Sequence, residues 1–135
     1  MGTQGQERPE RLTLLLVDDE VGYADVLAKR LSKRGMEVTV AHSGGEAIQK
    51  LRRQDFDVTV LDLKMEDMDG IEVLKIFKKI DPAMRVIMLT GHGSEEAARE
   101  ALALGAFDYV TKPCDLEELI AKIVHACRKG ERDDG

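Results

Sequence analysis

Leu12-Thr-Leu-Leu-Leu-Val17 is the stretch that decides the fold, because it is apolar on both faces of an extended chain. A strand with one face in water alternates apolar and polar residues, whereas a strand covered on both faces reads as a nearly continuous apolar run. A helical pattern follows over about residues 21–34, in which Leu27 and Leu31 lie one turn apart and Gly35 ends the helix. The stretch therefore predicts a buried strand that is followed directly by an amphipathic helix.

The same order of strand and helix recurs to the end of the chain. Further strands are predicted at residues 36–41, 58–62, 85–90 and 107–111. Helices are predicted after them, at about residues 44–53, 70–80, 95–104 and 116–128, with Ser43, Ser94 and Asp115 as capping residues. Five strand–helix units in strict alternation indicate an α/β fold, with a doubly wound parallel sheet covered by helices on both faces.

The composition fits one folded domain and excludes several functional classes. The 135 residues, 43% of them hydrophobic and 34% charged, are enough for a domain that needs no disulfide or structural metal. A net charge of −6 and an aromatic content of 4% argue against direct binding to nucleic acid. No apolar run reaches the length of a membrane span and no signal peptide opens the chain, so we expect a cytoplasmic protein without membrane contact. Polar residues at both ends predict a flexible leader over 1–10, a folded domain over 11–129 and a flexible tail over 130–135.

Charged and polar side chains stand where the predicted strands end. They are Asp18, Asp19 and Glu20 after the first strand, Asp62 on the third, Thr90 on the fourth and Lys112 after the fifth. In a doubly wound sheet the ligand site lies beyond the carboxyl ends of the strands, so we expect these groups to share a small volume. Neighbouring carboxylates raise one another's pKa unless a cation lies among them, and an all-oxygen set of ligands favours Mg²⁺. The sequence predicts a magnesium site with Lys112 beside it for an incoming anion.

These groups suit phosphoryl transfer to an aspartate. A carboxylate is a nucleophile toward phosphorus and forms an aspartyl phosphate. The transfer needs mainly positioning and neutralisation of charge, which one Mg²⁺, one lysine and one hydroxyl provide. A carboxylate that is already ionised at neutral pH needs no general base.

The same residues resemble a response-regulator receiver domain of two-component signal transduction, of the chemotaxis-regulator type. The motifs that carry the resemblance occur in order over about residues 12–128: Asp18-Asp-Glu20, Asp62-Leu-Lys-Met65, Met68-Asp-Gly70, Thr90-Gly-His92 and Lys112-Pro113. The resemblance implies a flavodoxin-like (βα)5 fold with strand order 2-1-3-4-5. Glu66 occupies a loop position at which many receivers carry proline.

The resemblance also implies a role for each site residue. Asp62 would be the phosphoacceptor. The ligands of Mg²⁺ would be Asp18, largely through a water, together with Asp19, Asp62 and the backbone carbonyl of Lys64. Thr90 and Lys112 would contact the phosphoryl oxygens, and Thr90 and Tyr109 would form the switch that accompanies activation. The Lys112–Pro113 peptide bond is expected to be cis.

The implied function is a phosphorylation-activated switch that catalyses its own phosphorylation and dephosphorylation, and not an enzyme acting on a separate substrate. The phosphoryl donor would be a histidine kinase or a phosphotransfer protein. No effector domain follows residue 135, so we expect output through a downstream protein effector; the alternative is a receiver module cut from a longer transcriptional regulator. A phosphatase of the haloacid dehalogenase type is a weaker alternative, because Lys64 stands where that class needs a second aspartate.

Overall fold

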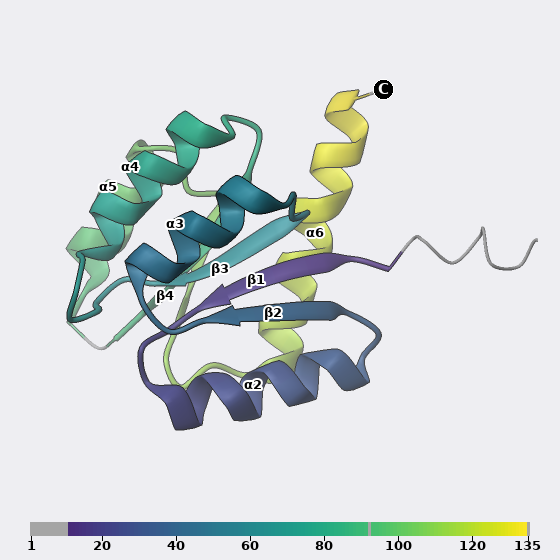
Figure 1. The fold of residues 1–135 in the computed structure, drawn as a ribbon, viewed down its shortest axis with the longest axis horizontal. Coiled ribbons are helices and arrows are strands. Elements are labelled where there is room, and N and C mark those ends of the chain that lie inside the picture. The colour runs from purple at the N-terminus through teal and green to yellow at the C-terminus, as the bar shows by residue number, and fades with distance from the viewer. Residues whose placement is uncertain (1–10, 92, 135) are drawn as a thin grey trace, which may run out of the picture.

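The computed structural model describes residues 11–91 and 93–134 (Figure 1). The strands are β1 (Thr13–Val17), β2 (Glu37–Ala41), β3 (Val58–Asp62), β4 (Arg85–Thr90) and β5 (Asp108–Thr111). The helices are α2 (Val21–Lys33), α3 (Gly44–Arg53), α4 (Gly70–Ile80), α5 (Glu95–Ala103) and α6 (Leu116–Asp134). The predicted alternation of strands and helices is confirmed, and the bounds of β3, α4 and β4 are as expected.

The five strands form one parallel sheet in the order β2-β1-β3-β4-β5, which confirms the expected topology. Val17 of β1 is in register with Leu61 of β3, and Thr90 of β4 with Thr111 of β5. Because all strands run in the same direction, their carboxyl ends meet at one edge of the sheet. The residues that follow β1, β3, β4 and β5 are therefore brought together there.

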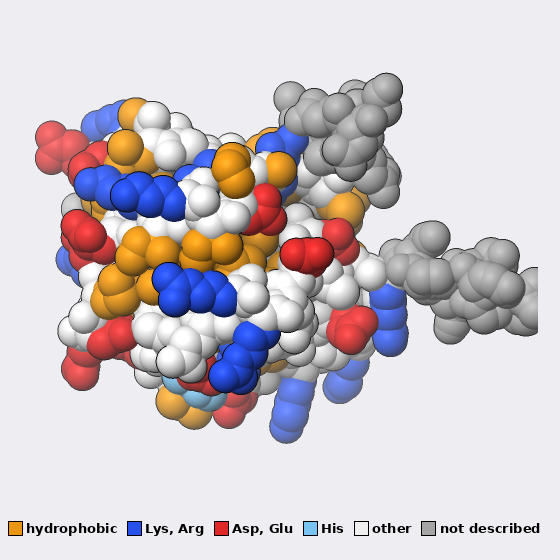
Figure 2. All heavy atoms as spheres, turned by 45° about the horizontal axis from the view of Figure 1, so that its top comes forward, with side chains coloured by type: hydrophobic (Ala, Val, Ile, Leu, Met, Phe, Trp, Pro, Cys, Tyr) orange, Lys and Arg blue, Asp and Glu red, His pale blue; other side chains and the backbone are white. Residues whose placement is uncertain are grey.

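Helices cover the sheet on both faces: α2 and α6 on one, and α3, α4 and α5 on the other (Figure 1). Successive side chains of a strand point to opposite faces, so Leu14 and Leu16 pack under α2 and α6, whereas Leu15 and Val17 pack under the other layer. Apolar side chains also gather on the surface of the α3–α4–α5 layer, where charged side chains surround them (Figure 2). Burial on both faces explains why β1 and β3 read as apolar runs.

Local signals in the sequence set most of the helix ends. Ser43 Oγ accepts a hydrogen bond from the backbone N–H of Glu46 at 3.0 Å, and Asp115 Oδ2 accepts one from Glu118 at 3.0 Å. Gly35 and Gly105 follow α2 and α5 with φ of +91° and +112°, the left-handed conformation that favours glycine after a helix. Both caps and the helix end at Gly35 are as predicted, and Gly105 directly follows the helix predicted at about residues 95–104.

Two predictions of helix ends were wrong. Ser94 precedes α5 but makes no capping hydrogen bond, because its backbone (φ −110°, ψ 23°) is not in the extended conformation that directs a capping side chain toward the first turn. Helix α6 ends at Asp134 and not near Arg128, since an interior Gly130 costs only about 1 kcal/mol and does not by itself end a helix.

Residues 1–10 lie outside the described part of the chain, so the division into leader, domain and tail stays a prediction. Among the described residues, no helix combines the length and apolarity needed to cross a membrane.

Candidate functional site

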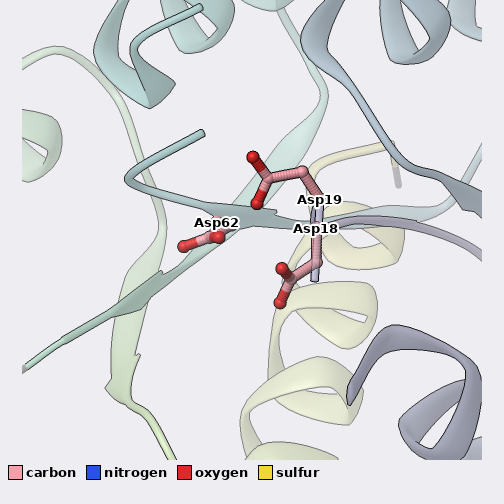
Figure 3. A group of neighbouring side chains, drawn as sticks. All are labelled: Asp18, Asp19 and Asp62. Atoms are coloured by element: carbon pink, nitrogen blue, oxygen red, sulfur yellow. The ribbon is translucent and has the colours of Figure 1, made fainter. Parts of the chain in front are cut away.

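Three aspartates meet at the carboxyl edge of the sheet. Asp18 follows β1 and is fully buried, Asp62 ends β3 and is 5% exposed, and Asp19 is partly exposed. Each contributes one carboxylate oxygen to a group whose members all lie within 4.8 Å of one another. Figure 3 shows Asp18 and Asp19 extending from neighbouring positions of the chain toward Asp62. The structure thus brings together the three side chains that the sequence predicted as metal ligands.

Backbone N–H groups fix the orientation of these carboxylates. Glu20 donates to Asp18 Oδ1 at 2.9 Å, and Glu66 donates to Asp19 Oδ2 at 2.8 Å. The N–H of Lys64 donates to Asp62 Oδ1 at 3.3 Å, while the Lys64 side chain is exposed. Each of the three carboxylates therefore accepts a hydrogen bond from a backbone N–H in the loop after β1 or the loop after β3.

Lys112 supplies the positive charge of the site. Its Nζ lies 3.0 Å from Asp18 Oδ2, 2.5 Å from Glu20 Oε1 and 3.6 Å from Asp62 Oδ2. Its backbone N–H donates to the carbonyl of Thr90 at 2.6 Å, and the Lys112–Pro113 peptide bond is cis. Burial lowers the pKa of Lys112, but the hydrogen bonds to Glu20 and Asp18 and the nearby charge of Asp62 outweigh burial and raise it. The ammonium group is therefore permanently charged at neutral pH.

The crowding of carboxylates changes the ionisation of Asp62. Burial, followed by the negative charge of Asp18, raises the pKa of Asp62 to about 7, although Lys112 and the N–H of Lys64 act in the opposite direction. A divalent cation among these oxygens would remove the repulsion that raises this pKa. The three carboxylates offer only oxygen ligands, the type that Mg²⁺ prefers. The residues present therefore fit a magnesium ion.

A cavity of about 680 Å³ gives access to Asp62 from solvent. Asp19, Lys64, Lys112 and Pro113 are among the residues that line it, and Asp62 itself forms part of its surface. A phosphate-bearing group can therefore reach the Asp62 carboxylate without displacing the core.

Thr90 and Tyr109 lie on neighbouring strands. Thr90 is buried at the end of β4, and Met88 of the same strand is in register with Tyr109 of β5. Because side chains alternate along a strand, Thr90, Met88 and Tyr109 share the face that packs under α3, α4 and α5. Tyr109 is partly buried there. The structure places the two residues on one face, and their role as a switch stays a prediction.

Several contacts of the site could not be read from the sequence. Glu20 was noted as the third acidic residue after β1, but its ion pair with Lys112 was not predicted. The contact of Tyr23 with Lys112 and the hydrogen bonds of Asp67 to the start of α3 were also missed. No sequence signal marks Asp67, because the first N–H groups of any helix lack an intrahelical partner whatever residues carry them.

Gly70 belongs to a quoted motif, and the structure shows why: a Cβ there would lie 2.6 Å from the carbonyl oxygens of Asp62 and Leu63.

A parallel sheet in the order 2-1-3-4-5, with buried aspartates and a lysine at its carboxyl edge, is the arrangement of a receiver domain. The family model of the response regulator receiver domain matches residues 14–124, and the chain belongs to this family. Membership in this family removes the support for a phosphatase of the haloacid dehalogenase type.

The chain is similar to one part of longer regulatory proteins and to a solved receiver domain. The transcriptional regulatory protein ZraR of Escherichia coli (strain K12) is 38% identical over 117 residues, which are 87% of this chain and 26% of ZraR. The transcriptional regulatory protein GlrR of the same organism is 41% identical over 110 residues, which are 82% of this chain and 25% of GlrR. The crystal structure of a response regulator receiver domain protein from Clostridium thermocellum is similar with a TM-score of 0.86 and 34% identity, covering 89% of this chain and 97% of that one. The chain therefore spans about a quarter of the length of these curated relatives and nearly all of the solved receiver domain.

Proposed function

We propose that this receiver domain accepts a phosphoryl group on Asp62 from the phosphohistidine of a histidine kinase or a phosphotransfer protein, in a reaction that depends on Mg²⁺. The observation that carries the proposal is the position of Asp62, a residue that is 5% exposed and lines the cavity, with its carboxylate 3.6 Å from the Lys112 ammonium. A structural aspartate buried beside another carboxylate would lower stability, so this arrangement favours a chemical role.

The residues of the chain divide the work of the transfer. The Asp62 carboxylate attacks phosphorus, a P–O bond forms, and the P–N bond breaks with its electron pair passing to the imidazole of the donor. Lys112 leaves Glu20 and binds the phosphoryl oxygens, and the Thr90 hydroxyl donates to the same group. A Mg²⁺ ion held by Asp18, Asp19, Asp62 and the backbone carbonyl of Lys64 would supply neutralisation of the negative charge.

The same site also supports dephosphorylation, because the aspartyl phosphate faces a cavity open to water. The domain would then set the lifetime of its own phosphorylated form without acting on a separate substrate.

We propose that the phosphorylated form alters the binding of a downstream protein effector. The names of ZraR and GlrR favour a second candidate, in which the receiver controls the transcriptional output of a longer regulator.

Incubation with acetyl phosphate and Mg²⁺, followed by intact-mass spectrometry, tests the proposal. The parent protein is expected to gain the mass of one phosphoryl group, and Asp62→Asn to gain none, because an amide is not a nucleophile here. Asp55→Asn is the matched control, since Asp55 is an exposed aspartate outside the site. Phosphorylation of Asp62→Asn to the level of the parent would overturn the assignment.

A further inference from the structure

Tyr23 connects two segments of the phosphoacceptor site that are 91 residues apart. It lies in the first turn of α2 and lines the cavity above Asp62. The Lys112 Nζ lies over its ring, 4.8 Å from the ring centroid. Its hydroxyl lies 3.3 Å from Cys114 Sγ and accepts a hydrogen bond from the backbone N–H of Cys114 at 3.5 Å. One side chain therefore contacts the ammonium of Lys112 and the residue that follows Pro113.

The ring and the carboxylates act on Lys112 in different ways. Asp18 and Glu20 hold the ammonium at fixed oxygen atoms, 3.0 and 2.5 Å away. An aromatic face attracts a cation through its quadrupole, and it offers no single atom as an acceptor. The ammonium can therefore move from Glu20 toward a group on Asp62 while it keeps the attraction of the ring.

The hydroxyl keeps the ring in place. Tyr23 is partly buried, and burial together with the contact to Cys114 raises the pKa of Tyr23 to about 12, so the hydroxyl is neutral at pH 7. A neutral hydroxyl between the sulfur and the backbone N–H of Cys114 ties the start of α2 to the loop after β5. The Tyr23 ring beside Lys112 is thus held by α2, from which it extends, and by the loop after β5, to which its hydroxyl is bonded.

We propose that Tyr23 is a positioning residue of the phosphorylation reaction: its aromatic ring holds the Lys112 ammonium at the cavity, within reach of a phosphoryl group on Asp62. This inference rests on the proposed function, because it assigns Tyr23 a part in the same reaction. It concerns the rate of the transfer, whereas the identity of the acceptor depends on Asp62 alone.

The test compares Tyr23→Phe, which keeps the ring, with Tyr23→Leu, which removes it and keeps an apolar side chain. Initial rates of phosphorylation are measured by intact-mass spectrometry over a range of phosphoramidate concentrations with Mg²⁺. We expect Tyr23→Phe to keep most of the parent rate and Tyr23→Leu to be about two- to fivefold slower, as the loss of a cation–π contact at a partly exposed position implies. Urea unfolding verifies that each variant is folded, and Tyr23→Met replaces Tyr23→Leu if the latter is not.

A second measurement follows Lys112 directly. The ring of Tyr23 should shift the NMR signals of the Lys112 ε-methylene protons upfield in the parent and in Tyr23→Phe, and this shift should be absent in Tyr23→Leu. Equal rates for all three proteins, or equal losses in Tyr23→Phe and Tyr23→Leu, would overturn the proposal. A parent protein that takes up no phosphate on Asp62 would instead contradict the proposed function. In that case the NMR signals of the Lys112 ε-methylene protons in the parent decide whether the Tyr23 ring lies against Lys112. Signals without an upfield shift would overturn this contact as well, and signals with the shift would support it.

Discussion

Asp67 accepts a hydrogen bond from the backbone N–H of Gly44 through Oδ1 at 3.0 Å, and one from Gly45 through Oδ2 at 3.1 Å. The loop that follows Asp62 is thereby joined to the first turn of α3. A carboxylate at a helix N-terminus also interacts favourably with the helix dipole. The two backbone hydrogen bonds hold the pKa of Asp67 below its usual range.

Replacement of Asp67 should lower stability in a pH-dependent way. Asp67→Ala is expected to lose about 1 kcal/mol at pH 7, the typical cost of losing a side chain that caps a helix. The folded-state pKa lies below the ordinary value of 3.8, so this contribution is present above that pH and is lost as the pH falls below it. Urea unfolding of parent and variant between pH 3 and pH 7 measures the difference. Asp67→Asn, which keeps one acceptor oxygen, should be intermediate, and a gap that does not depend on pH would contradict the role of the charge.

Gly70→Ala should disturb the loop that follows Asp62. The new Cβ would lie 2.6 Å from the carbonyl oxygens of Asp62 and Leu63, so the backbone must move. We expect a loss of about 1–3 kcal/mol in urea unfolding, the usual cost of overpacking, together with slower phosphorylation. Gly22→Ala is the matched control: nothing lies within 4 Å of its Cβ, and alanine in a helix should leave stability unchanged or raise it. Equal stability of Gly70→Ala and the parent would contradict the close contact.

Asp62→Asn should raise stability at alkaline pH in the absence of Mg²⁺. The pKa of Asp62 is about 7 in the folded state and 3.8 in the unfolded chain, so the folded state binds more protons in between. Stability therefore falls as the pH rises from about 4 to about 7, and the variant escapes this loss. At pH 8 it should be more stable by up to about 4 kcal/mol, since one pKa unit corresponds to about 1.4 kcal/mol. Thermal unfolding between pH 4 and pH 8 should show the two curves converging at the acid end, and parallel curves would contradict the shifted pKa.

Mg²⁺ should stabilise the parent protein more than Asp19→Ala. A ligand that binds only the folded state raises the unfolding temperature as its concentration increases, and removal of one carboxylate weakens that binding. Thermal unfolding at increasing Mg²⁺ concentration checks this, with Asp55→Ala as a control that removes an acidic residue outside the site. Identical Mg²⁺ responses of Asp19→Ala and the parent would count against Asp19 as a ligand.

A phosphoryl mimic at Asp62 should change the surroundings of Thr90 and Tyr109. Beryllium fluoride with Mg²⁺ is expected to shift the NMR signals of both residues and of the first turn of α5, because Thr90 and Tyr109 share one face of the sheet. Such a change is a shift between two populations that the phosphoryl mimic stabilises differently. Shifts confined to the residues around the three aspartates would contradict this coupling and leave the assignment of Asp62 intact.

Much of the fold could be predicted because its signals are local. Val58–Asp62 is an apolar run that ends on a charge, and Gly35 and Gly105 end their helices through backbone conformations that favour glycine. The grouping of Asp18, Asp62 and Lys112 followed from the rule that parallel strands end at one edge. The contact of Tyr23 with Lys112 could not be predicted, because it joins segments far apart in the chain and depends on side-chain direction. The missing cap at Ser94 depends on backbone angles that residue identity alone does not determine.

The last two residues of β4 lie on opposite faces of the sheet. Asp62 is in register with Leu89, which packs under α2 and α6, whereas Thr90, the next residue along β4, lies on the side that packs under α3, α4 and α5. The buried apolar side chains form two separate clusters, one under each helical layer, and the sheet lies between them. We therefore expect substitutions within one cluster to influence one another's effect on stability, because side chains in contact are energetically coupled, and substitutions in different clusters to have additive effects.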